Sequence, residues 1–175
     1  MRVFITSDTH FNHTNIIQYC NRPFEDVNEM NETLIKNWNS VIKNDDLVIH
    51  LGDVGLGNKG KISQILSRLN GRKMLIMGNH DHFKEKDYRE MGFETVSRFP
   101  ILWNGCFLLS HAPLYLDKNS QFFNIYGHIH DNTIEDGPEE NSKCVCVERT
   151  NYTPIFLYDT DRRIYGEEFL MKNLQ

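Results

Sequence analysis

Residues of metal-binding types follow five short apolar runs in this 175-residue sequence. Short apolar runs bounded by polar residues are typical of buried strands. In an open α/β sheet, ligands bind beyond the carboxyl ends of such strands. We therefore expect the polar side chains that follow the runs to converge on one site. In chain order they are Asp8 and His10, then Asp53, then Asn79, His80 and Asp81, then His111, and finally His128 and His130.

The types of these side chains indicate which ions they would bind. Apart from His80 and Asp81, the set comprises two carboxylates, one amide and four imidazoles, and it contains no thiolate. Mixed oxygen and nitrogen ligands suit Mn, Fe, Zn or Ni rather than an all-oxygen Mg²⁺ or Ca²⁺ cage. Asp53 could bridge two ions, since a carboxylate has two oxygens. Two ions roughly 3.5–4 Å apart hold the attacking and leaving oxygens of a phosphoryl transfer and lower the pKa of a bridging water towards ~7.

Four neighbouring residues are candidates for catalysis or substrate binding. His80 could protonate a leaving alkoxide or stabilise charge on the phosphoryl group. Asp81 could hold that imidazole in one tautomer, or cap a helix expected at 82–91. His13 and Arg22 could contact a substrate phosphate, although a loop histidine exposed to solvent and a surface arginine before proline are the ordinary alternatives.

Hydrophobic periodicity predicts the elements that would position these residues. Apolar residues recur at helical spacing over 30–42 and 62–69, whereas 2–6, 47–51 and 73–77 are expected to be strands. Strands dominate the second half of the chain, at 93–99, 106–110, 122–126, 144–148, 155–158 and 164–169. This order predicts an α/β (α+β) fold in which two mixed sheets pack face to face with helices outside. No linker or repeat divides residues 1–175, so we expect one domain.

Net charge and cysteine usage limit the binding partners and the cellular compartment to be expected. The net charge is −5, which gives no overall basic field to attract nucleic acid or an anionic membrane. No apolar stretch is long enough to span a membrane, and the N-terminus is too polar for a signal peptide. The four cysteines do not form CxxC pairs or a disulfide framework. We therefore expect reduced thiols and a cytoplasmic protein.

Taken in order, the motifs resemble those of the calcineurin-like metallophosphoesterase superfamily, in particular its small bacterial and phage members. The motifs are Asp8-Thr9-His10, Gly52-Asp53, Gly78-Asn79-His80-Asp81, the lone His111 and Gly127-His128-Ile129-His130. The resemblance implies a four-layer αββα sandwich with a two-ion centre, and Mn²⁺ as the ion to use in assays. It places Asp8, His10, Asp53 and His130 on one ion. It places Asp53, Asn79, His111 and His128 on the other, with His80 as the catalytic imidazole.

Departures from the family pattern narrow the expected substrate. Val54-Gly55-Leu56 follows Asp53 where protein serine/threonine phosphatases carry Asp-Arg-Gly, so that branch is disfavoured, while Ser110 replaces a common glycine before His111. At 175 residues we expect no cap domain, so that surface loops would select the substrate. We expect a binuclear phosphoesterase acting through a bridging hydroxide on a small mono- or diester, which could be a nucleotide, with no obligate protein partner. The alternatives are a metal-dependent nuclease and a non-catalytic protein-binding scaffold of the same fold.

Overall fold

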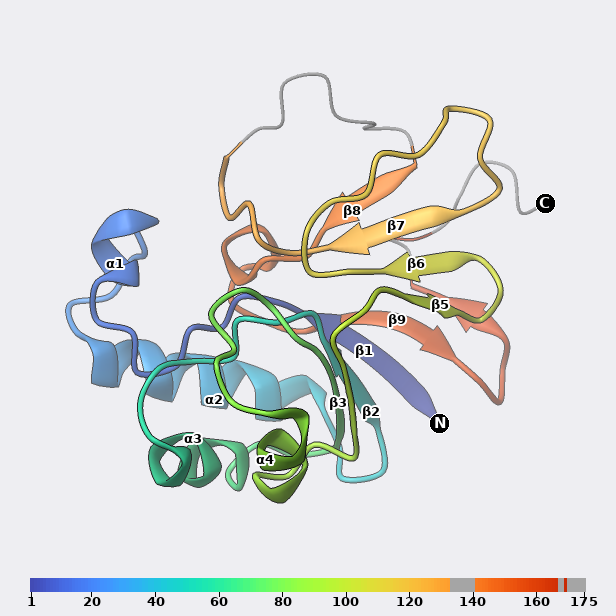
Figure 1. Cartoon of the computed structure of the whole chain (residues 1–175). Coiled ribbons are helices and arrows are strands. Elements are labelled where there is room, and N and C mark those ends of the chain that lie inside the picture. Colours follow the sequence, from blue (N-terminus) through green and yellow to red (C-terminus); the bar gives the residue numbers. More distant parts are fainter. Residues whose placement is uncertain (133–140, 167–168, 170–175) are drawn as a thin grey trace.

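The computed structural model describes residues 1–132, 141–166 and 169, which form two β-sheets stacked on each other (Figure 1). The six-stranded sheet has the order β10-β9-β1-β2-β3-β4, and the four-stranded sheet has the order β5-β6-β7-β8. Each sheet contains both parallel and antiparallel pairs, which confirms the prediction of two mixed sheets. The strands are β1 (Arg2–Thr6), β2 (Leu47–His50), β3 (Arg72–Ile76), β4 (Thr95–Ser97), β5 (Ile101–Trp103), β6 (Phe107–Leu109), β7 (Phe123–Tyr126), β8 (Ser142–Cys144), β9 (Ile155–Asp159) and β10 (Ile164–Tyr165).

The buried strand β1 separates two hydrophobic cores. Successive side chains of a strand point to opposite faces of the sheet. Val3 and Ile5 therefore join the core between the sheets, together with Phe107 and Leu109 of β6. Phe4, one position away, joins the core beneath the helices. Because both faces of the strand are covered, its sequence is a continuous apolar run rather than an alternating one.

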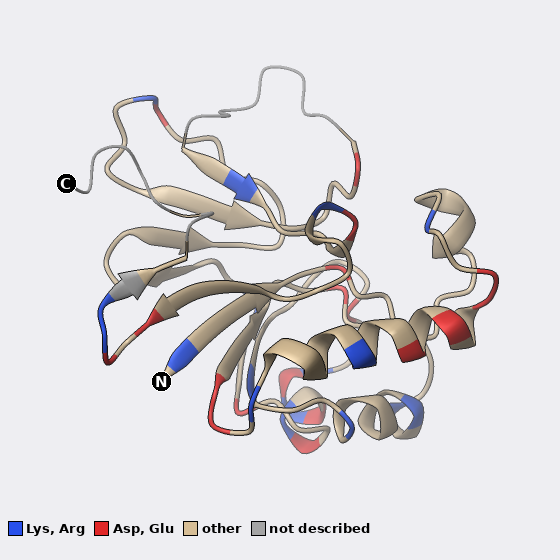
Figure 2. Cartoon of the chain, turned by 180° about the vertical axis from the view of Figure 1, so that it is seen from behind, with Lys and Arg blue, Asp and Glu red and all other residues tan. Residues whose placement is uncertain are grey.

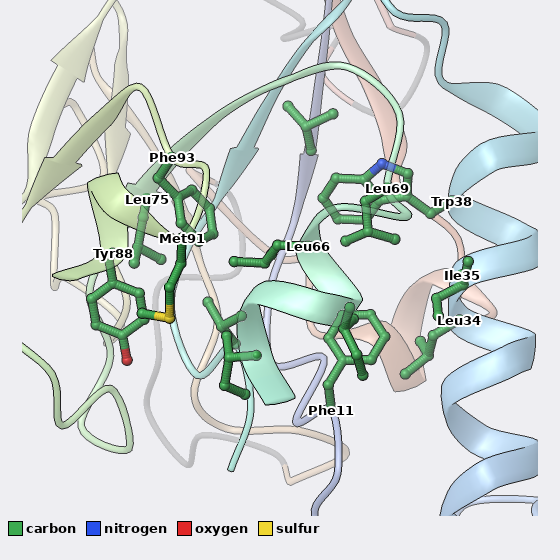
Figure 3. Packing of buried hydrophobic residues seen from close by; sticks show 14 of the residues in the cluster. Phe11, Leu34, Ile35, Trp38, Leu66, Leu69, Leu75, Tyr88, Met91 and Phe93 are labelled. Carbon is green, nitrogen blue, oxygen red and sulfur yellow. The ribbon is translucent and has the colours of Figure 1, made fainter. Parts of the chain in front are cut away.

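Three helices cover the outer face of the six-stranded sheet (Figure 1). They are α2 (Val27–Val41), α3 (Lys59–Leu66) and α4 (Glu85–Glu90); the short α1 (Ile16–Tyr19) projects beyond them. Figure 3 shows Leu34, Ile35 and Trp38 of α2 facing Leu66 and Leu69, which are among the apolar residues whose periodicity predicted these helices. The Asp26 carboxylate accepts hydrogen bonds from the amides of Asn28 and Glu29 and so caps the N-terminus of α2.

The layers differ in one respect from the expected four. In the described part of the chain, the outer face of the four-stranded sheet has no α-helix, so these residues form three layers.

Across the residues that the structure describes, no helix combines the length and apolar composition that crossing a bilayer requires.

Some element boundaries were wrong. The helix expected at 82–91 is only α4, and the strand expected at 144–148 ends at Cys144 and gives way to the 3₁₀ helix Val147–Thr150. These differences arise near the candidate site, where the backbone turns sharply to present side chains. The parallel strands β1, β2 and β3 still end at one edge of their sheet, and β6 and β7 likewise end at one edge of theirs.

Candidate metal centre

Asp8 is the most deeply buried of the candidate ligands, and its two oxygens have different surroundings. Oδ2 accepts hydrogen bonds from the His128 amide at 2.8 Å and from the Cys146 thiol at 3.3 Å. Oδ1 has no hydrogen-bond partner. It lies 3.9 Å from Nε2 of His10 and 3.8 Å from Nε2 of His130. One oxygen is thus fixed by the protein, while the other is left to face two imidazoles.

The two carboxylate oxygens of Asp53 also have different surroundings. Oδ1 accepts a hydrogen bond from the His80 amide at 2.8 Å. Oδ2 lies 3.5 Å from Nε2 of His10 and 3.6 Å from Nε2 of His111. This single oxygen therefore stands between two sets of side chains: a first ligand group of Asp8, His10, Asp53 and His130, and a second ligand group of Asp53, Asn79, His111 and His128.

The second ligand group is the more open of the two. The Asn79 side-chain oxygen lies 2.8 Å from Nε2 of His111 and 3.0 Å from Nδ1 of His128. These two imidazole nitrogens are 3.2 Å apart. Asn79 and His128 are exposed whereas His111 is buried, so this side of the site faces solvent.

The residues fit the pair of divalent ions that the motifs imply. Ligand atoms lie about 2.0–2.2 Å from Zn²⁺, so two atoms on one ion are at most about 4.4 Å apart, and every distance given above falls within that limit. Asp8 Oδ1 and His10 Nε2 are buried without any hydrogen-bond partner. Buried polar atoms are nearly always paired, so two adjacent unpaired ones indicate an ion-binding position.

Three of the histidines are held so that Nε2 faces the centre. His111 Nδ1 lies 2.7 Å from the Leu51 carbonyl, and His130 Nδ1 lies 2.9 Å from Oε1 of Glu148. Both partners are acceptors, so each Nδ1 donates to its partner, and in the neutral ring each Nε2 keeps a free lone pair. His10 Nδ1 lies 3.2 Å from Nδ1 of His13, which completes the same arrangement if His13 accepts. Contacts of this kind orient metal-binding imidazoles.

Glycine in the motifs permits these close approaches. A Cβ atom on Gly127 would collide with the Ser7 hydroxyl and with Oδ2 of Asp8, and one on Gly78 would collide with Oδ1 of Asp53. The glycine of Gly127-His128-Ile129-His130 therefore lets this loop of the four-stranded sheet lie against the end of β1. Glycine is used where backbone must pass this closely.

Backbone strain is concentrated at the candidate ligands. Five of the seven adopt the left-handed conformation, with φ between 49° and 73°: Asp8, His10, Asp53, His128 and His130. For a residue other than glycine this conformation costs roughly 1–2 kcal/mol. Strained non-glycine residues gather at functional sites, where surrounding structure over-determines them.

Burial and charge set the protonation of the site. Burial raises the pKa of Asp8 and lowers the pKa values of His10 and His128. For His130, burial opposes protonation, but hydrogen bonds with Cys20 and Glu148 outweigh it and raise the pKa to about 10. A proton and a cation therefore compete for His130, as metal binding to histidine requires the neutral ring.

His80 and His13 lie at the opening of the site. The His80 ring centroid is 5.4 Å from that of His10 and 6.4 Å from that of His13. The His80 side chain is exposed, and its imidazole makes no hydrogen bond with any described residue. The ring is thus held near the candidate ligands by its backbone and stays available to a ligand.

Asp81 does not hold the His80 imidazole, contrary to the expectation from the sequence. Its Oδ2 accepts hydrogen bonds from the amides of Asp53 and Gly78, both at 2.8 Å. Its Oδ1 accepts from the Val54 amide and the Tyr88 hydroxyl, both at 3.1 Å. With four donors already in place, the carboxylate ties together the loops that follow β2 and β3. It does not cap α4 either, whose N-cap is Lys84.

Arg22 is a second correction, because it is buried rather than available to a substrate phosphate. Its guanidinium donates to the carbonyls of Asp8 at 2.8 Å and Thr9 at 3.0 Å. It also contacts Oε1 of Glu148 twice, at 2.7 and 2.9 Å. Arg22 thus supports the strained segment that carries Asp8. Sequence reasoning missed Glu148 altogether, since nothing in the spacing or type of this residue marks it.

His50, which follows the apolar run of β2, is a buried structural residue. Its Nε2 contacts the Thr9 hydroxyl at 3.0 Å, and its Nδ1 accepts from the Gly52 amide at 3.1 Å. Burial lowers its pKa to about 3, so the ring is neutral at pH 7. His50 joins the loop after β1 to the loop after β2.

Comparisons with known proteins identify the family of this chain and several relatives. A family model described as calcineurin-like phosphoesterase matches residues 1–167. An uncharacterized protein of Methanocaldococcus jannaschii is 43% identical over 164 residues, covering 89% of this chain and 87% of its own length. The gene 66 protein of Mycobacterium phage L5 is 37% identical over 138 residues, covering 67% of this chain and 66% of its own.

Two solved structures share the fold. A protein of unknown function from Aquifex aeolicus superimposes with a TM-score of 0.63 and 28% identity, covering 89% of this chain and 95% of that one. The nuclease MPE of Pseudomonas putida superimposes with a TM-score of 0.50 and 19% identity, covering 73% and 61%. At that identity the second likeness shows the fold alone.

Proposed function

Because the chain belongs to the calcineurin-like phosphoesterase family, we propose that it hydrolyses a phosphomonoester or phosphodiester at a centre of two divalent transition-metal ions. The observation that carries the proposal is the position of Asp53 Oδ2, within 3.6 Å of imidazoles from both ligand groups. An oxygen so placed can be shared by two ions. Bound there, such ions would activate a water and neutralise charge on the phosphoryl group.

The chain's own residues have distinct tasks in this reaction. The first and second ligand groups would hold the ions, with Asp53 common to both. His80, exposed beside them, donates a proton to the departing alkoxide or a hydrogen bond to the phosphoryl oxygens. His13, whose ring lies near that of His80, contacts His10 through its Nδ1 and is available to a substrate phosphate.

The distribution of charge supports a small ester over a long nucleic acid. Of the four cations near α3 and β3 that could form a basic track, three are paired with carboxylates: Lys59 with Asp87, Arg68 with Glu32 and Arg72 with Glu94. Two of these carboxylates belong to the neighbouring helices α2 and α4, along which Figure 2 shows acidic residues among basic ones. A polyanion would gain little from cations that are already neutralised. The nuclease alternative therefore ranks second.

A reducing compartment fits the cysteines. All four are free, and the buried thiols of Cys144 and Cys146 are 3.4 Å apart without a disulfide. One of them donates to Asp8, so its thiol form is part of the site. These thiols support the cytoplasmic location, which stays a prediction.

A substrate panel tests the proposal. Chelator-treated protein supplied with Mn²⁺ is assayed on chromogenic mono- and diesters, 2′,3′- and 3′,5′-cyclic nucleotides and single-stranded DNA. We expect hydrolysis of at least one small ester, lost with chelator and restored by Mn²⁺. Asp53→Asn should bind neither ion firmly by elemental analysis, since the shared oxygen is weakened for both. Hydrolysis of DNA alone would favour the nuclease, and metal-independent turnover would refute the proposal.

A further inference from the structure

Glu148 is a buried carboxylate outside both ligand groups that nevertheless contacts one of their members. It lies in the 3₁₀ helix Val147–Thr150 with its side chain 2% exposed. Its Oε1 is 2.9 Å from Nδ1 of His130 and 2.7 Å from the nearer nitrogen of Arg22. A buried carboxylate is costly unless paired, and Arg22 provides the pairing.

The partners of the three inward-facing histidines are not equivalent. His111 is supported by the neutral carbonyl of Leu51, and His10 by the ring of His13. Only His130 is supported by a carboxylate. A carboxylate behind a metal-binding imidazole fixes the ring and makes its other nitrogen a stronger ligand. His130 belongs to the first ligand group alone, so this effect reaches one side of the centre.

We propose that Glu148, held in place by Arg22, is a positioning residue that makes the first ligand group bind a divalent ion more tightly than the second. The inference rests on the two-ion centre proposed above. It gives the centre a tightly held ion between Asp8 and His130 and a more readily exchanged ion on the open side, beside Asn79 and His128.

Burial and solvent access also favour tighter ion binding by the first ligand group than by the second. Asp8 and His10 are each no more than 1% exposed. Asn79 and His128 are exposed, and the His128 ring rests on contacts within its own ligand group. Ligands that are rigid and shielded from water lose less on binding an ion than mobile, solvated ones do.

A third ion beside Glu148 is the competing interpretation. Cys20, His130 and Glu148 offer ligand atoms within 4.8 Å of one another. Oε2 of Glu148 is buried without a hydrogen-bond partner, but the guanidinium of Arg22 already contacts Oε1 of the same carboxylate through two nitrogens, at 2.7 and 2.9 Å. A second cation at this carboxylate would face that positive charge directly. We therefore assign Glu148 to the support of His130.

Single-site variants test the proposal by direct measurement of ion binding. His128→Ala leaves the first ligand group intact, and His10→Ala leaves the second. Isothermal titration with Mn²⁺ gives the dissociation constant of each remaining site. Adding Glu148→Gln should weaken binding about 10–100-fold in the His128→Ala protein. It should change binding by less than about threefold in the His10→Ala protein, whose remaining ligands do not contact Glu148.

Glu32→Gln is the matched control, because Glu32 forms an exposed pair with Arg68 and belongs to neither ligand group. It should leave both dissociation constants unchanged. If Glu148→Gln fails to fold, as judged by circular dichroism, Arg22→Lys replaces it. A lysine keeps the charge but cannot reach Glu148 and two carbonyls at once, so binding should weaken in the His128→Ala background only.

The outcomes separate the two proposals. Equal weakening in both backgrounds, no weakening, or weakening only in His10→Ala would overturn the role of Glu148 while leaving the two-ion centre in place. Wild-type protein that binds a single Mn²⁺ or none would overturn the two-ion centre itself, and this inference with it.

Discussion

The His80 imidazole lies beside the candidate ligands without joining them. Its backbone amide donates to Oδ1 of Asp53, and its ring packs edge-on against the ring of His10. His80→Ala keeps that amide, so both ions should stay bound while turnover falls by about two to four decades, the usual value of a general acid. Steady-state kinetics and elemental analysis of the same preparation check the two halves of this prediction.

His82 provides the control for His80. Its ring is also exposed, and its centroid lies 6.2 Å from that of His80. His82→Ala should therefore reduce turnover far less than His80→Ala. Loss of ions from the His80→Ala protein would show that the imidazole is a ligand instead.

At the scale of elements, Asp81 joins the loop after β3 to the loop after β2. Asp81→Asn puts an amide nitrogen where an oxygen accepts hydrogen bonds, so two buried donors lose their acceptor. We expect the free energy of unfolding to fall by about 2–4 kcal/mol, from the cost of unpaired buried donors. Urea denaturation of the metal-free protein measures it, with the exposed Glu32→Gln as a variant that should change little.

The same variant decides between two roles for Asp81. A variant of unchanged stability with a large loss of turnover would support the original expectation that Asp81 orients His80. A destabilised variant whose residual turnover follows its folded fraction supports the loop-joining role.

The elements show most clearly which features of the fold and the site can be predicted from the sequence. The strand ends and the ligands after them were predictable, because apolar runs and the residues following them are local patterns. The roles of Asp81 and Arg22 were not, since they depend on contacts across 27–28 and 126 positions of the chain. No periodicity encodes such a contact. Glu148 could not be found for the same reason. The left-handed backbone at Asp8 and His10 was also unpredictable, because only glycine marks this conformation in a sequence.

At the scale of the whole molecule, the centre joins the two sheets. Asp8, His10 and Asp53 follow strands of the six-stranded sheet, whereas His111, His128 and His130 follow strands of the four-stranded sheet. Both ligand groups draw on both sheets. An ion bound by either group would therefore connect the two sheets where they meet, beyond the apolar core that lies between them.

Ion binding should consequently stabilise the entire fold rather than a single loop. An ion that binds only the folded state adds about 2.7 kcal/mol at a free concentration 100 times its dissociation constant. For a chain of this length that raises the melting temperature by roughly 5–10 °C. Calorimetry of chelator-treated protein with and without Mn²⁺ measures the shift, and unfolding should remain a single transition because both sheets are held together. His128→Ala should show a smaller shift. A melting temperature that does not change with Mn²⁺ would show that the ligands of the two sheets do not share their ions. So would two separate transitions of which Mn²⁺ raises the temperature of only one.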